Sequence, residues 1–169
     1  MRGVDEDRPH STPVIPLHQT GAERTVDLYD TFEHTLDGKG RLVLPAPFRS
    51  TYADGGFAVN LAECVGLFSY ESWDRWRRKV EQSRKVDRHR LRYLFASVSP
   101  IQPDAQNRIT INPRLRAKIG LGRDVVIVGS GSYANVYDRA AWERFEAQAE
   151  APDADGRTLA DDLADLEFV

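Results

Sequence analysis

The chain has one cysteine and no long apolar run. The single cysteine, Cys64, excludes an internal disulfide and a cysteine-rich zinc site. Apolar stretches such as 124–129 are far too short to span a bilayer. The acidic segment 1–8 is not followed by an apolar run, so we expect no secretory signal. These absences favour a protein of the reducing cytoplasm with no membrane partner.

Residues typical of catalysis or metal binding are also scarce. The four histidines and Cys64 have no ligand-like spacing, so we expect no metal site. Cys64 has no activating base nearby in the sequence and is interpreted as a packed thiol rather than a nucleophile. The segment 129–132 is interpreted as a hairpin turn rather than a phosphate cradle. Because no carboxylate pair, triad or phosphate loop is found, we expect no enzyme, no cofactor and no small-molecule substrate.

The 169 residues carry a net charge of −3, but that charge is distributed unevenly. Residues 1–28 have a net charge of −2 and residues 150–169 a net charge of −6, which leaves +5 for residues 29–149. The first segment is rich in proline and has no apolar periodicity, which is typical of a flexible arm. The last is interpreted as a solvated or docking segment. The basic body favours a polyanionic partner only weakly, because many solvated surfaces carry such a charge.

The sequence contains an internal repeat. The segment 37–49, DGKGRLVLPAPFR, aligns with 104–116, DAQNRITINPRLR, 67 residues further on. Both copies have an Asp, an Arg four residues later and a second Arg eight residues beyond that. A later block, 67–76, aligns with 136–145 at an offset of 69. Each repeat is about 55 residues, which is marginal for independent stability, so we expect the two to pack against each other.

Each repeat is predicted to contain strands, a tight turn and helices. Period-two alternation predicts a strand over 29–36, and 37–40 is typical of a hairpin turn leading into a second strand over 41–44. Gly40 and its counterpart Asn107 both tolerate the positive φ of such a turn. Two more strands and a helix complete each repeat. The residues expected to be buried by these helices are Trp73, Trp76 and Val80 in the first repeat, and Trp142, Phe145 and Ala149 in the second.

The predicted fold is α+β and mainly β. We expect two β/α repeats that form an intramolecular pseudo-dimer with a small barrel-like core and peripheral helices. The predicted parts are a flexible N-terminal arm (1–28), a first repeat (29–83), a helical connector (84–95), a second repeat (96–150) and an acidic C-terminal tail (151–169).

The repeated Asp-x-x-x-Arg pattern allows two interpretations. In the structural one, Asp37 pairs with Arg41 and Asp104 pairs with Arg108, which stiffens each turn. In the functional one, the arginines face DNA, because a two-stranded ribbon fits the roughly 12 Å major groove and arginine binds guanine N7 and O6. The two agree if each aspartate orients its arginine before binding. The basic cluster at 75–79 is interpreted as a solvated helix face rather than a nucleic-acid contact.

These motifs resemble those of the MraZ family of bacterial transcription regulators, whose half-units belong to the AbrB-like (SpoVT/AbrB) DNA-binding superfamily. The duplicated turn, apolar strand, proline and helical arginine carry the resemblance, which covers residues 29–150. It implies a regulator of transcription that binds double-stranded DNA, usually as repressor of the division and cell-wall gene cluster that includes its own gene. It also implies a nucleoid-associated, head-to-tail ring of identical subunits on short G-rich direct repeats in promoters.

Carried over to this sequence, the resemblance implies DNA-binding roles for Lys39, Arg41, Arg49, Arg108 and Arg116, and orienting roles for Asp37 and Asp104. The second repeat departs from the pattern because Gln106 stands where the first has Lys39. The lost charge predicts that Arg41→Ala weakens DNA binding more than Arg108→Ala does. The alternative is an AbrB-like antitoxin or protein-interaction module whose acidic tail binds a basic partner, against which the duplication argues.

Overall fold

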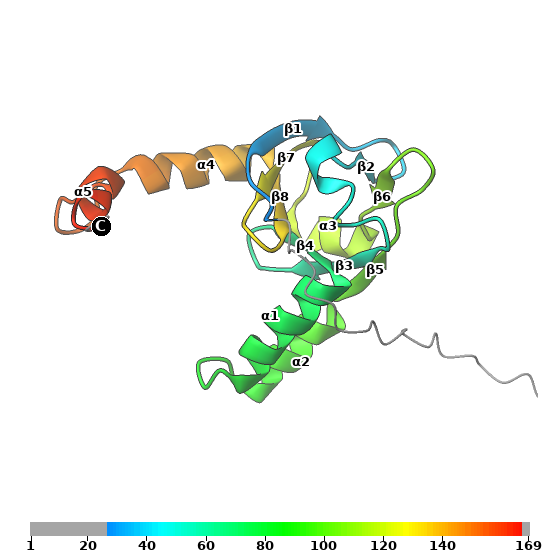
Figure 1. Cartoon of the computed structure of the whole chain (residues 1–169), viewed down its shortest axis with the longest axis horizontal. Coiled ribbons are helices and arrows are strands. Elements are labelled where there is room, and N and C mark those ends of the chain that lie inside the picture. The colour runs from blue at the N-terminus through cyan, green and yellow to red at the C-terminus, as the bar shows by residue number, and fades with distance from the viewer. Residues whose placement is uncertain (1–26, 167–169) are drawn as a thin grey trace, which may run out of the picture.

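The computed structural model describes residues 27–166, which form an α+β fold built mainly on antiparallel sheet (Figure 1). The first part of the chain contains β1 (Thr31–Thr35), β2 (Arg41–Val43), the 3₁₀-helix η1 (Ala46–Phe48), β3 (Gly56–Asn60), β4 (Val65–Ser69), α1 (Tyr70–Gln82) and α2 (Arg88–Ala96). The second part contains β5 (Ser99–Ile101), β6 (Arg108–Thr110), α3 (Pro113–Ile119), β7 (Asp124–Gly129), β8 (Ala134–Asp138), α4 (Arg139–Glu150) and α5 (Leu159–Ala164). Most of the predicted N-terminal arm, residues 1–26, and the tail residues 167–169 lie outside the described residues.

The two repeats exchange strands. A six-stranded sheet has the order β1-β7-β8-β4-β3-β5, and a separate two-stranded ribbon joins β2 to β6. The first strand of each repeat therefore pairs with the other repeat: β1 with β7, and β5 with β3. The strands β4 and β8 join the two halves at the centre of the sheet. Within residues 27–166 the strands do not close into a barrel.

The predicted hairpin between 29–36 and 41–44 is wrong, although the tight turn between them is present. β1 pairs with β7 and β2 with β6, and the Leu36 N–H donates to the carbonyl of Arg123 rather than to the following strand. The turn fixes the chain direction over only a few residues. The other repeat supplies the apolar strand β7 as partner for β1, so pairing between repeats replaces pairing within one. The predicted hairpin around 129–132 is confirmed, since β7 and β8 pair in antiparallel register.

One core is shared by both repeats. Leu42 and Leu44 of the first repeat and Ile109 and Ile111 of the second are fully buried in the same cluster. The predicted alternation of β2 is confirmed, because Val43 between the two leucines is exposed. Tyr52 is also fully buried, and its hydroxyl donates to the carbonyl of Leu67 at 2.7 Å. Burial of these side chains fixes which face of the ribbon is left for solvent.

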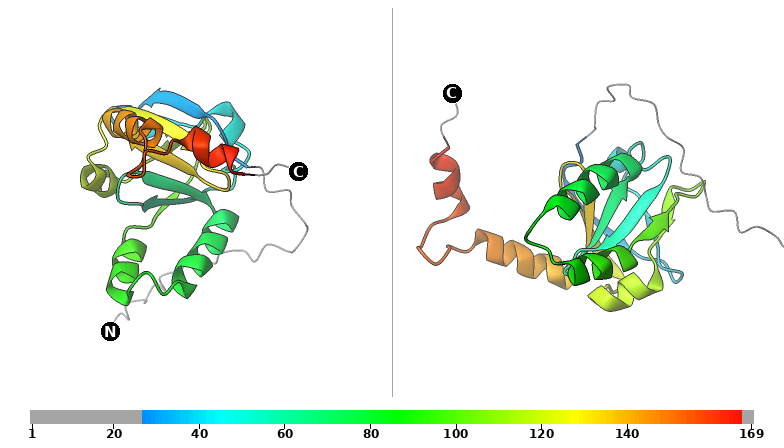
Figure 2. Two further views of the ribbon diagram at one scale, coloured as in Figure 1. Left: turned by 90° about the vertical axis from the view of Figure 1, so that its left-hand side faces the viewer. Right: turned by 90° about the horizontal axis from the view of Figure 1, so that it is seen from below.

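The helical ends of the two repeats differ (Figure 2). Trp73 of α1 is buried, and its ring contacts that of Phe95 on α2, with centroids 6.2 Å apart. On α4 the expected burial of Phe145 and Ala149 is wrong: Phe145 is 42% exposed and Ala149 is exposed. The physical reason is that Leu94 and Phe95 of α2 pack in one cluster with Trp73, whereas no helix of the described residues lies beside α4 in Figures 1 and 2.

Candidate nucleic-acid interface

The turn before β2 is held by one carboxylate. The N–H of Gly40 donates to the carbonyl of Asp37 at 2.9 Å, and the N–H of Asp37 donates to the carbonyl of Arg41 at 3.0 Å. Oδ1 of Asp37 accepts from the N–H groups of Lys39 and Arg41, each at 2.9 Å. Gly40 has φ = +71°, which lies in the left-handed region that glycine adopts at little cost. A short polar side chain therefore fixes the whole turn.

The turn before β6 has the same geometry. The N–H of Asn107 donates to the carbonyl of Asp104 at 2.9 Å, and Oδ1 of Asp104 accepts from Gln106 at 2.9 Å and Arg108 at 3.0 Å. Asn107 has φ = +57°, so asparagine occupies the position where glycine stands in the first turn. The expectation that both copies share one backbone conformation is confirmed.

In both turns the aspartate also pairs with the arginine side chain. Nε of Arg41 lies 2.5 Å from Oδ2 of Asp37, and Nε of Arg108 lies 2.8 Å from Oδ2 of Asp104. The Arg41 N–H, and then the Arg41 side chain and Lys39 N–H, lower the pKa of Asp37 to about 2, while the Arg108 N–H is the main cause of a lowered pKa at Asp104. Neither Nη group of either arginine makes a hydrogen bond within residues 27–166. Each guanidinium is thus oriented by the ion pair at its Nε atom, and its two Nη groups remain available to a partner.

The β2–β6 ribbon brings the two arginines onto one face. Arg41 lies opposite Thr110, and Arg108 lies opposite Val43. Val43 and Thr110 are exposed and the two arginines are partly exposed. In this register Arg41 and Arg108 are diagonal neighbours, for which a separation of about 7–8 Å between Cα atoms is typical. Two oriented arginines therefore stand side by side on the outer face of a narrow ribbon.

Each turn is also tied to the opposite repeat. The N–H of Leu44 donates to the carbonyl of Asn107 at 2.8 Å, and the N–H of Ile111 donates to the carbonyl of Gly40 at 3.0 Å. These bonds extend the ribbon by one residue at each end. If the turn before β2 or the turn before β6 moved, these bonds to the other repeat would be strained.

The second arginine of each motif is held in an equivalent way. Nε of Arg49 donates to the carbonyl of Leu44 at 3.1 Å, and Nε of Arg116 donates to the carbonyl of Ile111 at 3.2 Å. The guanidinium of Arg116 also lies against Gly40, where a Cβ atom would stand 2.6 Å from Cζ of the arginine. The first turn is thus in contact with the helix of the second repeat. Both the positive φ and the position of the Arg116 guanidinium therefore favour glycine over a residue with a Cβ atom at this position.

The fifth predicted DNA-binding residue, Lys39, is exposed at the tip of the first turn, and Gln106 is exposed at the same place in the second. Lys39 and the four arginines therefore lie on or next to the β2–β6 ribbon, on the side of the body away from α4 and α5 (Figure 1). Elsewhere in residues 27–166, no three His, Cys, Asp or Glu side chains are arranged to hold a metal ion. No helix in that part of the chain is both long and apolar enough to cross a membrane.

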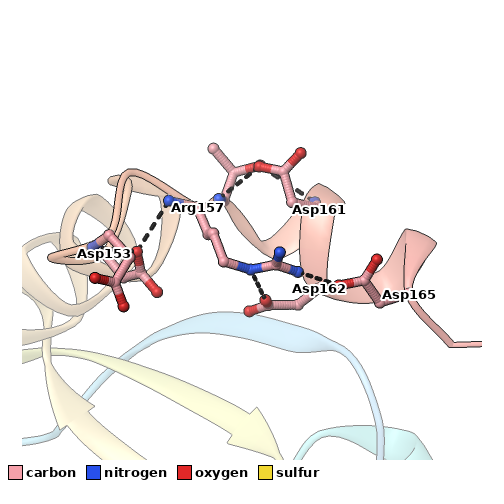
Figure 3. A network of polar contacts seen from close by, with 7 residues as sticks. Asp153, Arg157, Asp161, Asp162 and Asp165 are labelled. Atoms are coloured by element: carbon pink, nitrogen blue, oxygen red, sulfur yellow. Dashed lines mark hydrogen bonds and ion pairs between the residues drawn. The ribbon is translucent and has the colours of Figure 1, made fainter.

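A third turn of the same kind was missed in the sequence. The segment 153–157, DADGR, again has Asp at the first position and Arg at the fifth, and Gly156 has φ = +77°. Oδ1 of Asp153 accepts from the N–H of Arg157 at 2.9 Å, as in the other two turns. The arginine side chain differs, because it binds Asp162 of α5 and Asp165 at the end of that helix (Figure 3). The spacing of Asp, Gly and Arg is the signal that would have identified this turn.

Comparisons with known proteins agree with the duplication. The family model for MraZ proteins, a family described as antitoxin-like, matches residues 28–92 and again 94–162. The chain belongs to the MraZ family. A relative named Transcriptional regulator MraZ from Leifsonia xyli subsp. xyli is 40% identical over 125 residues, which cover 72% of this chain and 87% of the relative.

Two more distant MraZ relatives carry the same name. The one from Thermomicrobium roseum is 35% identical over 139 residues, covering 80% of this chain and 96% of its own length. The one from Bifidobacterium longum is 33% identical over 146 residues, covering 83% and 95%. The family resemblance inferred from the two turns is confirmed. The relatives are named as regulators of transcription and not as enzymes, which agrees with the expected non-enzymatic role.

Proposed function

We propose that this protein regulates transcription by binding double-stranded DNA through the outer face of the β2–β6 ribbon. The observation that carries the proposal is the pair of clamped arginines, Arg41 and Arg108, side by side on that face. A two-stranded ribbon fits the major groove, and an arginine can bind guanine O6 and N7 with two donors at once. The names of the relatives support the same function.

Within this proposal the residues have separate roles. Arg41 and Arg108 contact guanine edges, and Asp37 and Asp104 orient them, which reduces the side-chain entropy lost on binding. Lys39 contacts phosphate. The side chains of Arg49 and Arg116, held at the ends of the ribbon, contribute to the same basic surface. Phosphate contacts set the register, and the two base contacts supply the sequence preference.

We infer that the two repeats, with bounds at 29–83 and 96–150 and the connector 84–95 between them, act as an intramolecular pseudo-dimer of AbrB-like units. Support comes from the exchange of β1 and β5 between the halves and from the core that both halves share. Each half supplies one strand of the ribbon, so one chain presents both arginines.

The proposed target is a set of short G-rich direct repeats in the promoter of the division and cell-wall gene cluster that includes the protein's own gene. Direct repeats have no dyad, so identical subunits can occupy them in equivalent ways only when the subunits associate head to tail. A closed ring of such subunits raises the effective concentration of each ribbon near the next repeat. Binding there represses the cluster, and the protein is then associated with the nucleoid in the cytoplasm.

The test is a titration of the full chain with DNA from upstream of its own gene, against scrambled DNA of equal length, over a series of salt concentrations. We expect specific binding that is at least about a thousandfold tighter than binding to scrambled DNA, and a fall in both affinities with salt. A ratio near one would overturn sequence-specific regulation.

A second candidate is an antitoxin-like module that binds a basic protein through its acidic C-terminal segment. The description of the family and the exposed acids after α4 favour it. The measurement that separates the two is a pulldown with the full chain and with a chain ending at residue 150. A stable protein partner lost with residues 151–169 would favour the antitoxin-like module.

A further inference from the structure

Each repeat ends in a helical segment, and the two segments have opposite charge. We call residues 70–96, with α1 and α2, the basic hairpin, and residues 139–166, with α4 and α5, the acidic arm. The basic hairpin has nine basic and four acidic residues, a net charge of +5. The acidic arm has three basic and eight acidic residues, a net charge of −5. The first segment folds back on itself, while the second extends from the body (Figures 1 and 2).

Much of the charge on the basic hairpin is not neutralised within the chain. The ion pairs of the hairpin link neighbouring turns of one helix or its cap, as between Arg77 and Glu81 or Arg90 and Asp87. In the described part of the chain, no ion pair is formed by its remaining cations, which are Lys79, Arg84, Lys85, Arg88 and Arg92. All five are exposed. They form a cationic surface around the loop between α1 and α2.

The acidic arm, whose last part the sequence predicted to be a solvated or docking segment, has a defined local structure. Nε of Arg157 donates to Asp162 at 3.1 Å, and the same guanidinium pairs with Asp165, so the turn 153–157 is fastened to α5 (Figure 3). Thr158 caps α5 through a reciprocal pair of bonds with Asp161. The arm therefore presents its charge in a defined geometry.

The arm also has apolar side chains without a covering element. Leu159, Leu163 and Leu166 are 61%, 48% and 55% exposed, and Phe145 of α4 is 42% exposed. Large apolar side chains exposed together beside charged residues are typical of an interaction site. Six acids of the arm form no ion pair within residues 27–166, and these are Glu143, Glu146, Glu150, Asp153, Asp155 and Asp161.

We propose that the acidic arm of one copy binds the basic hairpin of a second copy. Because the two surfaces differ, the contact is heterologous and leaves one free hairpin and one free arm, which propagates head to tail. The proposal rests on the self-association included in the proposed function and names the surfaces that produce it. The hairpin fits the arm better than the β2–β6 ribbon does, since Arg41 and Arg108 are already paired with their own aspartates.

The test is sedimentation velocity of the full chain without DNA, using charge reversal on each surface. The hairpin variant is Arg84→Glu with Lys85→Glu and Arg88→Glu, and the arm variant is Glu146→Lys with Glu150→Lys and Asp155→Lys. All six side chains are exposed and form no ion pair within residues 27–166, so the variants should fold, as circular dichroism will verify. The matched control, Arg84→Lys with Lys85→Arg and Arg88→Lys, keeps every charge.

We expect either reversal alone to raise the dissociation constant of the assembly at least about tenfold, because like charges then face each other. The variant that combines all six substitutions exchanges the charges of the two surfaces and should regain assembly. The control that keeps every charge should assemble like the unmodified chain. A monomeric unmodified chain, or single reversals that assemble normally, would overturn the proposal. DNA binding is measured separately, with DNA that carries a single binding repeat. If the chain shows no sequence preference for that DNA while the charge exchange still restores assembly, the DNA-binding role is contradicted and the contact between copies is supported.

Discussion

The two repeats agree in detail at their Asp-x-x-x-Arg turns and differ at their helical ends. In each turn one aspartate satisfies two backbone N–H groups and one guanidinium, so the conformation is determined locally and tolerates Asn107 in place of Gly40. The helical ends depend on what packs against them: Trp73 is covered by α2, whereas Phe145 is left exposed. Local hydrogen bonding thus gives the two turns the same conformation, whereas the burial of the helical ends depends on the elements that pack against them.

The third turn sharpens this comparison. Its backbone matches the other two, yet Arg157 turns to Asp162 and Asp165 and not back to Asp153. The backbone of the turn therefore does not by itself leave the arginine side chain available to a partner. On the β2–β6 ribbon, Arg41 and Arg108 lie opposite Thr110 and Val43, neither of which carries a carboxylate. The outer edges of the two guanidinium groups therefore stay open.

The largest expected effect tests the difference between the helical ends. Trp73→Ala should lower the free energy of unfolding by about 3–5 kcal/mol, because it removes a buried ring that contacts Phe68 and Phe95. Phe145→Ala should cost about 1–2 kcal/mol in the isolated subunit, because that ring is already 42% exposed and loses only its contacts with Tyr137 and Trp142. Urea denaturation of dilute protein measures both. Equal losses would mean that α4 is covered as well as α1.

The next effect tests the equivalence of the turns. Gly40→Ala should cost about 1–2 kcal/mol, since alanine at φ = +71° is strained and its Cβ would meet Arg116. Asn107→Gly should change the stability by no more than about 0.5 kcal/mol, because both residues adopt the left-handed region. Thermal unfolding of the two variants gives the comparison. A costly Asn107→Gly would show that the asparagine side chain has a role that the first turn lacks.

A smaller effect concerns the charge that the second turn lacks. Lys39→Ala should reduce the slope of log affinity against log salt by about one unit, because one phosphate contact is lost. Gln106→Ala at the matching position should leave the slope unchanged. Titrations with operator DNA at several salt concentrations measure both. The same slope for Lys39→Ala and the unmodified chain would remove Lys39 from the interface.

The smallest effect is the acid dependence of the first turn. The pKa of Asp37 is lowered to about 2 from an ordinary 3.8, so the carboxylate is bound more strongly to its partners than to water. The stabilisation is complete above about pH 4 and is lost as the pH falls through 2. Carboxyl chemical shifts followed by NMR should give a midpoint near pH 2. A midpoint near 4 would mean that the clamp is absent in solution.

The sequence was sufficient for the parts that depend on local spacing. The positions of Asp37, Arg41, Asp104 and Arg108 predicted both turns and their ion pairs, and period-two alternation predicted the buried face of β2. Strand partners could not be derived in this way, because alternation shows which face is buried and not which strand lies alongside. The predicted hairpin failed for that reason.

Two features of the structure were not predicted from the sequence, for different reasons. The turn 153–157 has the same Asp-x-x-x-Arg spacing as the other two turns, but the acids around it led to the interpretation of a solvated or docking segment. The exposure of Phe145 could not be predicted, because the helical pattern of α4 is the same as that of a helix covered on one face. The exposure depends on which elements pack against α4, and the helical pattern does not show them.

The most direct test of the central claim is the affinity of three arginine variants for DNA that carries a single repeat, so that assembly does not contribute. Arg41→Ala and Arg108→Ala should each weaken binding by about 1–3 kcal/mol, the former more than the latter, because each removes a bidentate base contact. Arg157→Ala removes an arginine from a turn of the same backbone and should leave the affinity within about twofold. If Arg157→Ala weakens binding as much as Arg41→Ala, or if neither ribbon variant weakens it, the paired arginines of β2 and β6 are not the DNA-reading surface.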